Sequence, residues 1–405
     1  MKIQLCLCLM IVFAACFSCK QQKRAVSNSL WGIAKDSGYS GSCVNLFKAK
    51  DGSVIISWVR DISDSQSVLC YAVSPDGKAF GPTIEVSTSD NVHPHAENLP
   101  RVIKTPQGKL LAAWGAANPN PKNPYAGLVY FSWSADNGKS WSSRQSLSND
   151  SNSIDQRYFD IDILKDDRVG VIWLDSRNDA KKEGSSLYFA TFNEKNAIVN
   201  EKAIGATCCQ CCRTDLFVDK EGNVHTVYRK IINDSIRDMV HAVSYDNGNT
   251  FSSAERISAD NWVINGCPHS GPAIAQTQEG IAFAWYTLGS GGGVFYTTSK
   301  DNGKTFSKRD SVSSRPSAKH PQLQVSDAGD QLIVWDESSS QGNRIGLQVR
   351  SRDGKKLENT FLTDSTGRAS FPVIKALGNQ FLVAFSGRKH ADDKEQVFYK
   401  IVDLQ

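Results

Sequence analysis

Four cysteines in five residues are the most chemically distinctive feature of this sequence. The segment reads Cys208-Cys209-Gln210-Cys211-Cys212, and a further thiol follows in Gly266-Cys267-Pro268-His269. Thiolate and imidazole ligands together suit Cu(I) or Zn. The candidate metal ligands are Cys208, Cys209, Cys211, Cys212, Cys267 and His269. The spacing matches no standard zinc-finger pattern, and disulfides, for example between Cys267 and the cluster, are the favoured alternative, with redox chemistry a third interpretation.

Three nearly identical octapeptides show how the chain positions such residues. They begin at Ser134, Ser244 and Ser299 and follow the pattern Ser-x-Asp-Asn-Gly-x-Ser/Thr-aromatic. Asp-Asn-Gly favours a tight turn, and a strand-like apolar run precedes each copy. The second and third copies lie 55 residues apart, and the first and second lie 110 apart. The chain is therefore predicted to consist of repeats, and the Asp residues of the octapeptides are predicted to be structural.

This octapeptide resembles the Asp-box, or BNR repeat, of the sialidase (neuraminidase) superfamily. The resemblance covers most of the chain from about residue 40 and implies a β-propeller that handles carbohydrate. The segment from Cys208 to Gly271 also resembles a group of cysteine-containing, exported, sialidase-like bacterial propellers. Asp-boxes also occur in propellers that only bind partners, so the motif predicts the fold more specifically than it predicts hydrolysis.

A second signature, an apolar strand that ends in an aromatic residue, predicts the number of blades. It occurs seven times, and its aromatic residues are Trp58, Trp114, Trp173, Tyr228, Trp285, Trp335 and Phe385. Seven occurrences favour an all-β, seven-bladed propeller over residues 29–405, with six blades as the alternative. Residues 29–35 are predicted to add the outer strand that completes the last blade.

The repeats predict where the cysteines lie. About 15 positions before the aromatic signature stands a column of residues: Cys43, Leu99, Tyr158, Arg213, Ser270 and His320. In a propeller these positions begin the inner strands, which crowd together at one mouth of the central channel. We therefore expect Cys43, the 208–212 cluster, Cys267, His269 and His320, and also His95, to converge there.

The sialidase resemblance implies further site residues. Such an enzyme holds a carboxylate with arginines and uses a Tyr nucleophile with an acid for the leaving group. Pro100-Arg101-Val102-Ile103 resembles the Arg-Ile-Pro segment of that family, although the Ile and the Pro are absent at the matching positions. The candidates are Arg101, Arg213 and Arg229 for an acidic group, Asp160 or Asp162 as the acid, and Tyr158 or Tyr286 as the nucleophile.

The N-terminus indicates export. The apolar run from Ile3 to Phe17 is too short to span a membrane and fits a signal peptide. Residues 1–19 resemble a lipoprotein signal peptide with a lipobox, which makes Cys19 the lipidated residue; Cys16 and an ordinary cleaved signal are the alternatives. Residues 20–28 would form a short tether. The propeller is thus predicted to lie in the bacterial cell envelope, periplasmic or surface-exposed, where disulfides persist.

Composition excludes one class of partner and leaves three functions open. The formal net charge is only +4 over 405 residues, so the composition does not indicate a basic surface for nucleic acid. The only membrane contact expected is the lipid anchor. The leading hypothesis is a propeller that acts on or binds a carbohydrate or glycoconjugate at the channel mouth, as an exo-glycosidase of the sialidase type. The alternatives are a non-catalytic propeller that binds a partner or glycan, and a Cu or Zn site at the channel mouth.

Overall fold

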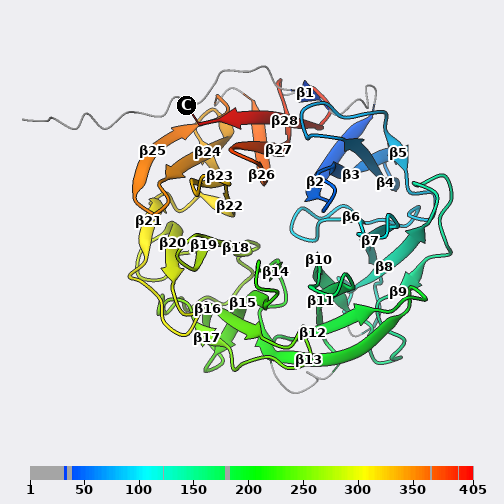
Figure 1. Cartoon of the computed structure of the whole chain (residues 1–405), viewed down its shortest axis with the longest axis horizontal. Helices are drawn as coiled ribbons and strands as arrows, with labels where there is room; N and C mark the ends of the chain where they lie inside the picture. Colours follow the sequence, from blue (N-terminus) through cyan, green and yellow to red (C-terminus); the bar gives the residue numbers. More distant parts are fainter. Residues whose placement is uncertain are drawn as a thin grey trace, which may run out of the picture.

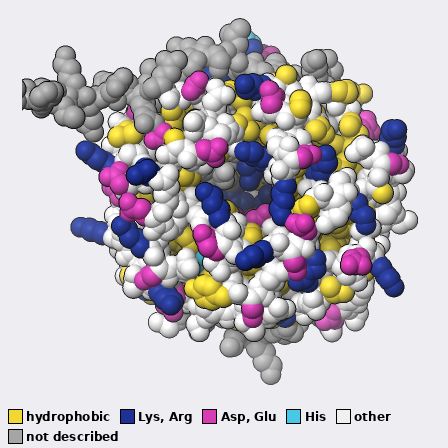
Figure 2. All heavy atoms as spheres, viewed as in Figure 1, with side chains coloured by type: hydrophobic (Ala, Val, Ile, Leu, Met, Phe, Trp, Pro, Cys, Tyr) yellow, Lys and Arg dark blue, Asp and Glu magenta, His cyan; other side chains and the backbone are white. Residues whose placement is uncertain are grey.

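The structure is a ring of antiparallel sheets (Figure 1), and the face viewed in Figure 2 is hollowed at its centre by the central channel. This computed structural model describes residues 32–33, 39–121, 123–177, 183–364, 367–390 and 392–404, and every regular element within them is a β-strand. No helix in these ranges is long and apolar enough to cross a membrane. The predicted signal peptide, the lipidation site at Cys19 or Cys16, and the tether lie outside the described residues and stay predictions.

The strands follow one another around the ring in groups of four. The first two groups contain β2 (Ser40–Lys48), β3 (Val54–Ser63), β4 (Gln66–Ser74) and β5 (Ile84–Glu85), then β6 (Arg101–Lys104), β7 (Leu110–Ala117), β8 (Gly127–Ser134) and β9 (Gln145–Ser146). The next two contain β10 (Gln156–Ile163), β11 (Val169–Asp175), β12 (Ser185–Phe192) and β13 (Ile198–Cys208), then β14 (Asp215–Val218), β15 (Val224–Ile232), β16 (Ile236–Ser244) and β17 (Glu255–Arg256).

The remaining groups complete the ring. They contain β18 (Ala273–Gln276), β19 (Ile281–Thr287), β20 (Gly293–Ser299) and β21 (Asp310–Ser313), then β22 (Lys319–Val325), β23 (Gln331–Ser339), β24 (Gly342–Arg350) and β25 (Lys356–Phe361), and finally β26 (Arg368–Leu377), β27 (Gln380–Arg388), β28 (Gln396–Asp403) and β1 (Gly32–Ile33). The first and last segments of the described chain therefore share a sheet. Gly32 pairs with Tyr399 and Ile33 with Phe398, as expected for a strand supplied from residues 29–35.

One pairing joins two of the groups. Strand β13 contacts β15 through Cys208 and Lys230, so β10 to β17 form a continuous eight-stranded sheet. Counted as continuous sheets, the described strands form six; counted as groups of four, they form seven. The all-β propeller fold is confirmed, while the number of blades stays a prediction.

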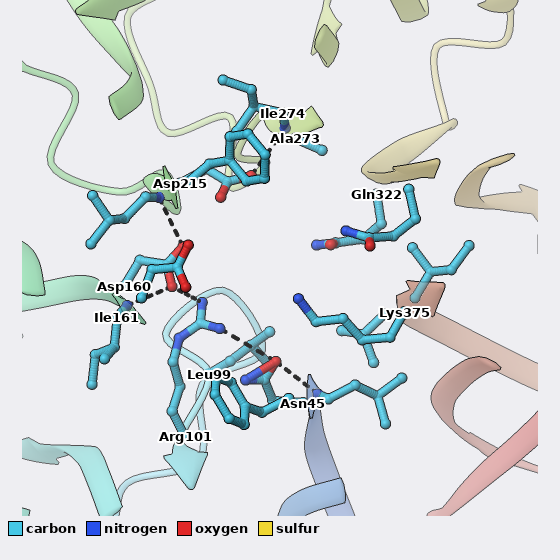
Figure 3. Close-up of a pocket in the computed structure, with 18 of the residues that line it drawn as sticks. Asn45, Leu99, Arg101, Asp160, Ile161, Asp215, Ala273, Ile274, Gln322 and Lys375 are labelled. Carbon is cyan, nitrogen blue, oxygen red and sulfur yellow. Dashed lines mark hydrogen bonds and ion pairs between the residues drawn. The ribbon is translucent and has the colours of Figure 1, made fainter. Parts of the chain in front are cut away.

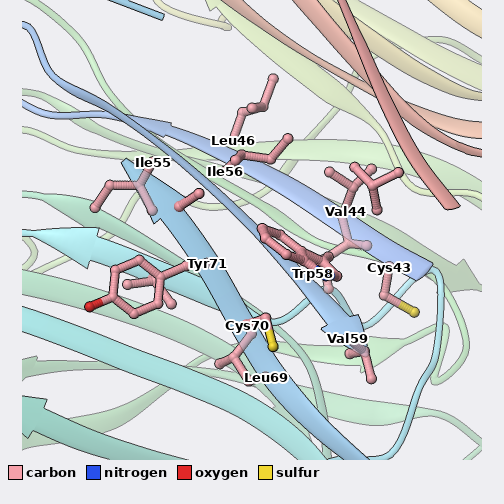
Figure 4. Packing of buried hydrophobic residues seen from close by; sticks show 14 of the residues in the cluster. Cys43, Val44, Leu46, Ile55, Ile56, Trp58, Val59, Leu69, Cys70 and Tyr71 are labelled. Carbon is pink, nitrogen blue, oxygen red and sulfur yellow. The ribbon is translucent and has the colours of Figure 1, made fainter. Parts of the chain in front are cut away.

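Large aromatic side chains form the core between the sheets. Trp58, Trp114, Trp173, Trp285 and Trp335 each lie on the second strand of their group and are at most 1% exposed. Figure 4 shows Trp58 beside Val44 and Val59 from the same sheet. Cys70 lies on β4 and is fully buried in the same cluster. Burial of such large rings supplies much of the stability of each sheet.

The octapeptides form closed turns at the strand ends. In the second copy Asp246 accepts hydrogen bonds from the backbone N–H (2.8 Å) and hydroxyl (2.6 Å) of Thr250 and from the hydroxyl of Ser244 (2.7 Å). Asn247 and Gly248 adopt positive φ, and a Cβ on Gly248 would lie 2.4 Å from the ring of Phe189 in the neighbouring group. Only glycine fits there, so the turn chemistry also sets the packing between groups.

The three octapeptide carboxylates predict an acid-sensitive contribution to stability. Hydrogen bonds, first of all from the hydroxyls of Ser140, Thr250 and Thr305, lower the pKa of Asp136, Asp246 and Asp301 from 3.8 to about 2. A lowered folded-state pKa stabilises above the unfolded value, and that stabilisation is lost as pH falls from 3.8 through 2. In urea unfolding, the variant with all three residues changed to Asn is expected to be less stable than the wild type at pH 5. The difference should shrink toward pH 2; an equal difference at every pH would contradict this role.

Candidate functional site

Four inner strands begin with the same irregularity. The pairing of β2, β10, β22 and β26 with the next strand shifts register near the channel mouth, as expected of a β-bulge. In each bulge one non-glycine residue has a left-handed backbone, with φ between 52° and 56°; these residues are Cys43, Tyr158, His320 and Phe371. A bulge redirects a side chain, so three members of the predicted column are turned by the backbone at the same mouth.

A pocket of about 530 Å³ opens beside these bulges, and we call it the mouth pocket. Its lining includes His93, His95, Asn98, Asn123, Tyr125, Arg157, Tyr158, Gln210, Cys211, Cys267 and His269. Cys43 and His320 lie at its border. The backbone N–H of His95 donates to the Cys43 sulfur, and the Nε2 of His320 donates to the carbonyl of His269 (2.9 Å). The structure thus brings Cys43, His95, Cys211, Cys267, His269 and His320 together at this mouth.

The mouth pocket holds aromatic and imidazole groups. The His95 and Tyr158 rings meet edge to face with centroids 5.5 Å apart, and the His95 and His269 rings are 6.3 Å apart. Burial lowers the pKa of His95 and raises that of Tyr158, so both are uncharged at neutral pH. Arg157 provides positive charge beside Tyr158 while pairing with Asp155 (2.7 Å). This chemistry suits hydrogen bonding and recognition of an acidic group.

Three of the four clustered cysteines lie together under the mouth pocket, and we call Cys209, Cys211 and Cys212 the thiol cluster. Their sulfurs all lie within 4.8 Å of one another, with Cys209 Sγ 3.4 Å from Cys211 Sγ and 3.9 Å from Cys212 Sγ. Hydrogen bonds with Cys211 and Cys212 lower the pKa of the Cys209 thiol, and nearby Arg229 and Arg237 act in the same direction. Cys209 is therefore the thiol of the cluster that loses its proton most readily, since the pKa values of Cys211 and Cys212 are raised.

The other cysteines lie apart from the thiol cluster. Cys208 ends β13 and packs with Leu187, Leu216 and Tyr228, and Cys267 is exposed in the lining of the mouth pocket. Burial raises the pKa of Cys43 to about 12, which makes this thiol inert. The structure records no disulfide among the described cysteines. Even the 3.4 Å contact in the thiol cluster is far longer than an S–S bond of about 2.05 Å.

A second cavity, of about 140 Å³, occupies the channel between the inner strands. Arg101 contacts Asp160 (2.9 Å) and Asn45 (3.4 Å) there, and Lys375 lies opposite (Figure 3). On the face viewed in Figure 2, Lys and Arg side chains surround the central hollow. The predicted residues Arg101, Asp160, Asp162 and Arg213 all line this channel cavity.

The channel carboxylates connect neighbouring inner strands. Asp160 accepts the backbone N–H of Leu216 (3.0 Å), and Asp162 accepts that of Val218 (2.9 Å). Both acceptors are 56 residues from their donors, one repeat along the chain. Burial raises the pKa of Asp162 to about 6, but its oxygens are occupied by backbone donors. The predicted acids thus have a structural role in the ring.

The other predicted sialidase residues lie elsewhere. Arg229 is 2% exposed and donates to the carbonyls of Arg237, Ser270 and Tyr286. Tyr286 donates its hydroxyl to the carbonyl of Pro316 (3.0 Å). Neither residue lines the channel cavity or the mouth pocket. Among the described residues, the three arginines therefore do not meet in one pocket, and neither tyrosine has a carboxylate hydrogen-bond partner.

Sequence reasoning missed several polar residues of the mouth pocket, among them Asn123, Tyr125 and Arg157. Asn123 and Tyr125 belong to residues 118–125, a loop rich in Asn and Pro between β7 and β8. Such an insertion is a signal that the repeats alone do not explain, because binding residues concentrate in loops. Arg157 stands directly before the column residue Tyr158, and no sequence pattern marks it.

Comparisons with known proteins agree with this architecture. A family model described as a BNR repeat-like domain matches residues 67–280. A solved structure of a protein of unknown function from Dyadobacter fermentans is 15% identical, with a TM-score of 0.57, over 92% of this chain and 97% of that one. The polysaccharide lyase Uly1 is 11% identical, with a TM-score of 0.56, over 95% of each chain.

A third similar structure is that of a sialidase. The K499G mutant of the NanB sialidase from Streptococcus pneumoniae is 12% identical, with a TM-score of 0.52, over 93% of this chain and 71% of that one. Identities at this level establish a shared fold only. The search of curated proteins found no match.

Proposed function

Because the chain belongs to the BNR repeat-like domain family, we propose that it is a carbohydrate-binding propeller whose mouth pocket holds a sugar with an acidic group. The observation that carries this proposal is the size and lining of the mouth pocket. Its volume of about 530 Å³ lies within the usual range of about 300–1,000 Å³ for ligand sites, whereas the channel cavity of about 140 Å³ lies below it.

The lining matches the chemistry of an acidic sugar. Tyr125 is 82% exposed and offers an aromatic face to the apolar side of a sugar ring. The side-chain amides of Asn123 and Gln210 offer donors and acceptors for hydroxyl groups. Arg157 supplies a planar cation for a carboxylate. These groups come from three separate segments of the chain, so a sugar would be held from several sides.

The finer form of the proposal is an exo-glycosidase of the sialidase type. The sialidase and polysaccharide lyase that share the fold act on carbohydrates, which supports a carbohydrate ligand. Hydrolysis of the sialidase type would require a tyrosine with a carboxylate partner and arginines that reach the same ligand. The contacts of Tyr158, Tyr286 and Arg229 favour binding over this chemistry.

Calorimetric titration with a panel of sialylated and uronic-acid oligosaccharides tests the proposal. We expect at least one acidic glycan to bind, and Tyr125→Ala to weaken its binding about tenfold through loss of the aromatic contact. Arg157→Met should weaken acidic glycans more than their neutral analogues. Tyr245→Ala, which removes an exposed tyrosine from an octapeptide turn, is the matched control and should leave binding unchanged.

The same panel separates binding from turnover. Release of sugar from a fluorogenic sialoside, lost in Arg101→Ala, would replace the binding form of the proposal by the glycosidase form. Binding that is equally strong in the Tyr125→Ala and Tyr245→Ala variants would contradict the assignment to the mouth pocket, as would the absence of any acidic glycan ligand.

A further inference from the structure

We propose that the thiol cluster is a soft-metal site in which Cys209, Cys211 and Cys212 bind one Cu(I) ion through three thiolates. This inference does not depend on the carbohydrate proposal, because the three proposed ligands differ from the residues proposed to contact the sugar, and only the route from solvent passes through the mouth pocket. It rests on the arrangement of the three sulfurs, on the charged groups around them and on the route from solvent.

The sulfur positions are close to those that a metal requires. A metal about 2.3 Å from each of three sulfurs in one plane separates the sulfurs by about 4.0 Å. The contacts of Cys209 with Cys211 and Cys212 are 3.4 and 3.9 Å, and the whole set lies within 4.8 Å. A shift of the Cys211 sulfur by about half an ångström would lengthen its 3.4 Å contact with Cys209 to the separation that an ion requires.

The number of ligands favours Cu(I) over Zn. In the described part of the chain no fourth His, Cys, Asp or Glu donor joins the group. Structural zinc sites take four ligands, whereas soft thiolates select Cu(I), which accepts three. The three sulfurs and Ile231 form a small buried cluster of their own, so the site is also dry.

Two buried guanidinium groups prepare the site for negative charge. Arg237 Nη1 donates to the Cys209 sulfur (3.6 Å), while its Nη2 pairs with Glu183. Arg229 is 2% exposed, and the partners found for it are three carbonyl oxygens and the ring of Trp262; its Nε makes no hydrogen bond. A buried cation without a carboxylate is costly unless an anion lies nearby. Three thiolates around a monovalent ion supply that anion.

An ion can reach the site from the mouth pocket. Cys211 is a member of the thiol cluster and also lines the mouth pocket. This one proposed ligand therefore connects the buried cluster with the pocket. Cys267 and His269 line the same pocket and can receive an incoming soft ion before it moves inward.

The test uses the full-length chain, purified with reductant and titrated anaerobically with Cu(I) against a chromophoric chelator. We expect about one Cu(I) per chain, and X-ray absorption should show three sulfur neighbours at about 2.3 Å. Loss of a ligand in Cys211→Ser should weaken Cu(I) binding about a hundredfold or more, since even outer-shell changes cost 10–100-fold. Circular dichroism checks that this variant folds.

The matched control is Cys267→Ser, which removes an exposed thiol outside the thiol cluster and should retain the tight site. A parallel titration with Zn separates the two metals. One tightly bound Zn with no Cu(I) would overturn the choice of metal and keep the thiolate site. Less than about a tenth of an equivalent of either metal, or equal losses in the two serine variants, would overturn the site. So would a reduced chain that binds no metal and forms a disulfide within the cluster in air.

Discussion

Replacement of Glu97 by alanine is expected to lower the free energy of unfolding by about 3–5 kcal/mol, as for other broken buried ion pairs. Glu97 is 2% exposed and lies between β5 and β6, at the channel mouth. One carboxylate oxygen accepts the backbone N–H of Gly271 (2.7 Å) and that of Arg213 (3.4 Å), and the other lies 3.7 Å from the Arg213 guanidinium. A single side chain thus connects three groups of strands that are far apart in sequence.

Glu97→Gln separates the charge from the hydrogen bonds. Glutamine keeps an acceptor for Gly271 but cannot pair with the Arg213 guanidinium, so its loss should be smaller, about 1–3 kcal/mol. Urea unfolding at neutral pH, followed by tryptophan fluorescence, gives both values. A loss below about 1 kcal/mol for Glu97→Ala would show that the mouth is held by other contacts.

Replacement of Trp285 by alanine is expected to cost about 3–5 kcal/mol through the cavity that it leaves. Trp285 is 1% exposed on β19, and its Nε1 donates to Asp260 (2.7 Å). Asp260 also accepts a hydrogen bond from the hydroxyl of Ser258 and pairs with Arg309. The indole N–H is therefore one of three groups that hold this buried carboxylate. The substitution removes packing and a donor together.

Trp285→Phe is the control that separates loss of the hydrogen-bond donor from loss of packing. Phenylalanine retains much of the volume and leaves Asp260 without the indole donor, for an expected loss of about 1–3 kcal/mol. Thermal and urea unfolding of the two variants measure the difference. Equal losses would show that the hydrogen bond, and not the packing, dominates at this position.

The repeats made most of the fold predictable from the sequence. The octapeptide turns and the buried tryptophans depend on short segments, where residue types and spacing decide the conformation. The family resemblance and the β-propeller fold are confirmed on this basis. The same spacing located the channel mouth, because equivalent positions of repeats lie at equivalent heights.

The candidate site was less predictable, because it depends on backbone detail and on contacts between repeats. Residue type does not reveal that Tyr158 and His320 take a left-handed backbone. Nor does it show that Asp160 is occupied by an N–H from the next repeat. The cysteines illustrate the same limit, since Cys208 ends a strand and faces the core while its neighbour Cys209 joins the thiol cluster.

The pairing of β1 with β28 has a consequence for the way the chain is made. The last sheet unites residues 32–33 with residues 398–399, so its hydrogen bonds cannot form before nearly the whole polypeptide has been synthesised. Until then residues 32–33 lack their partner strand, and the last sheet exposes the unpaired edge of β27 to other nascent chains. A chaperone that covers exposed strand edges would therefore increase the yield of folded protein most at the step that closes the ring.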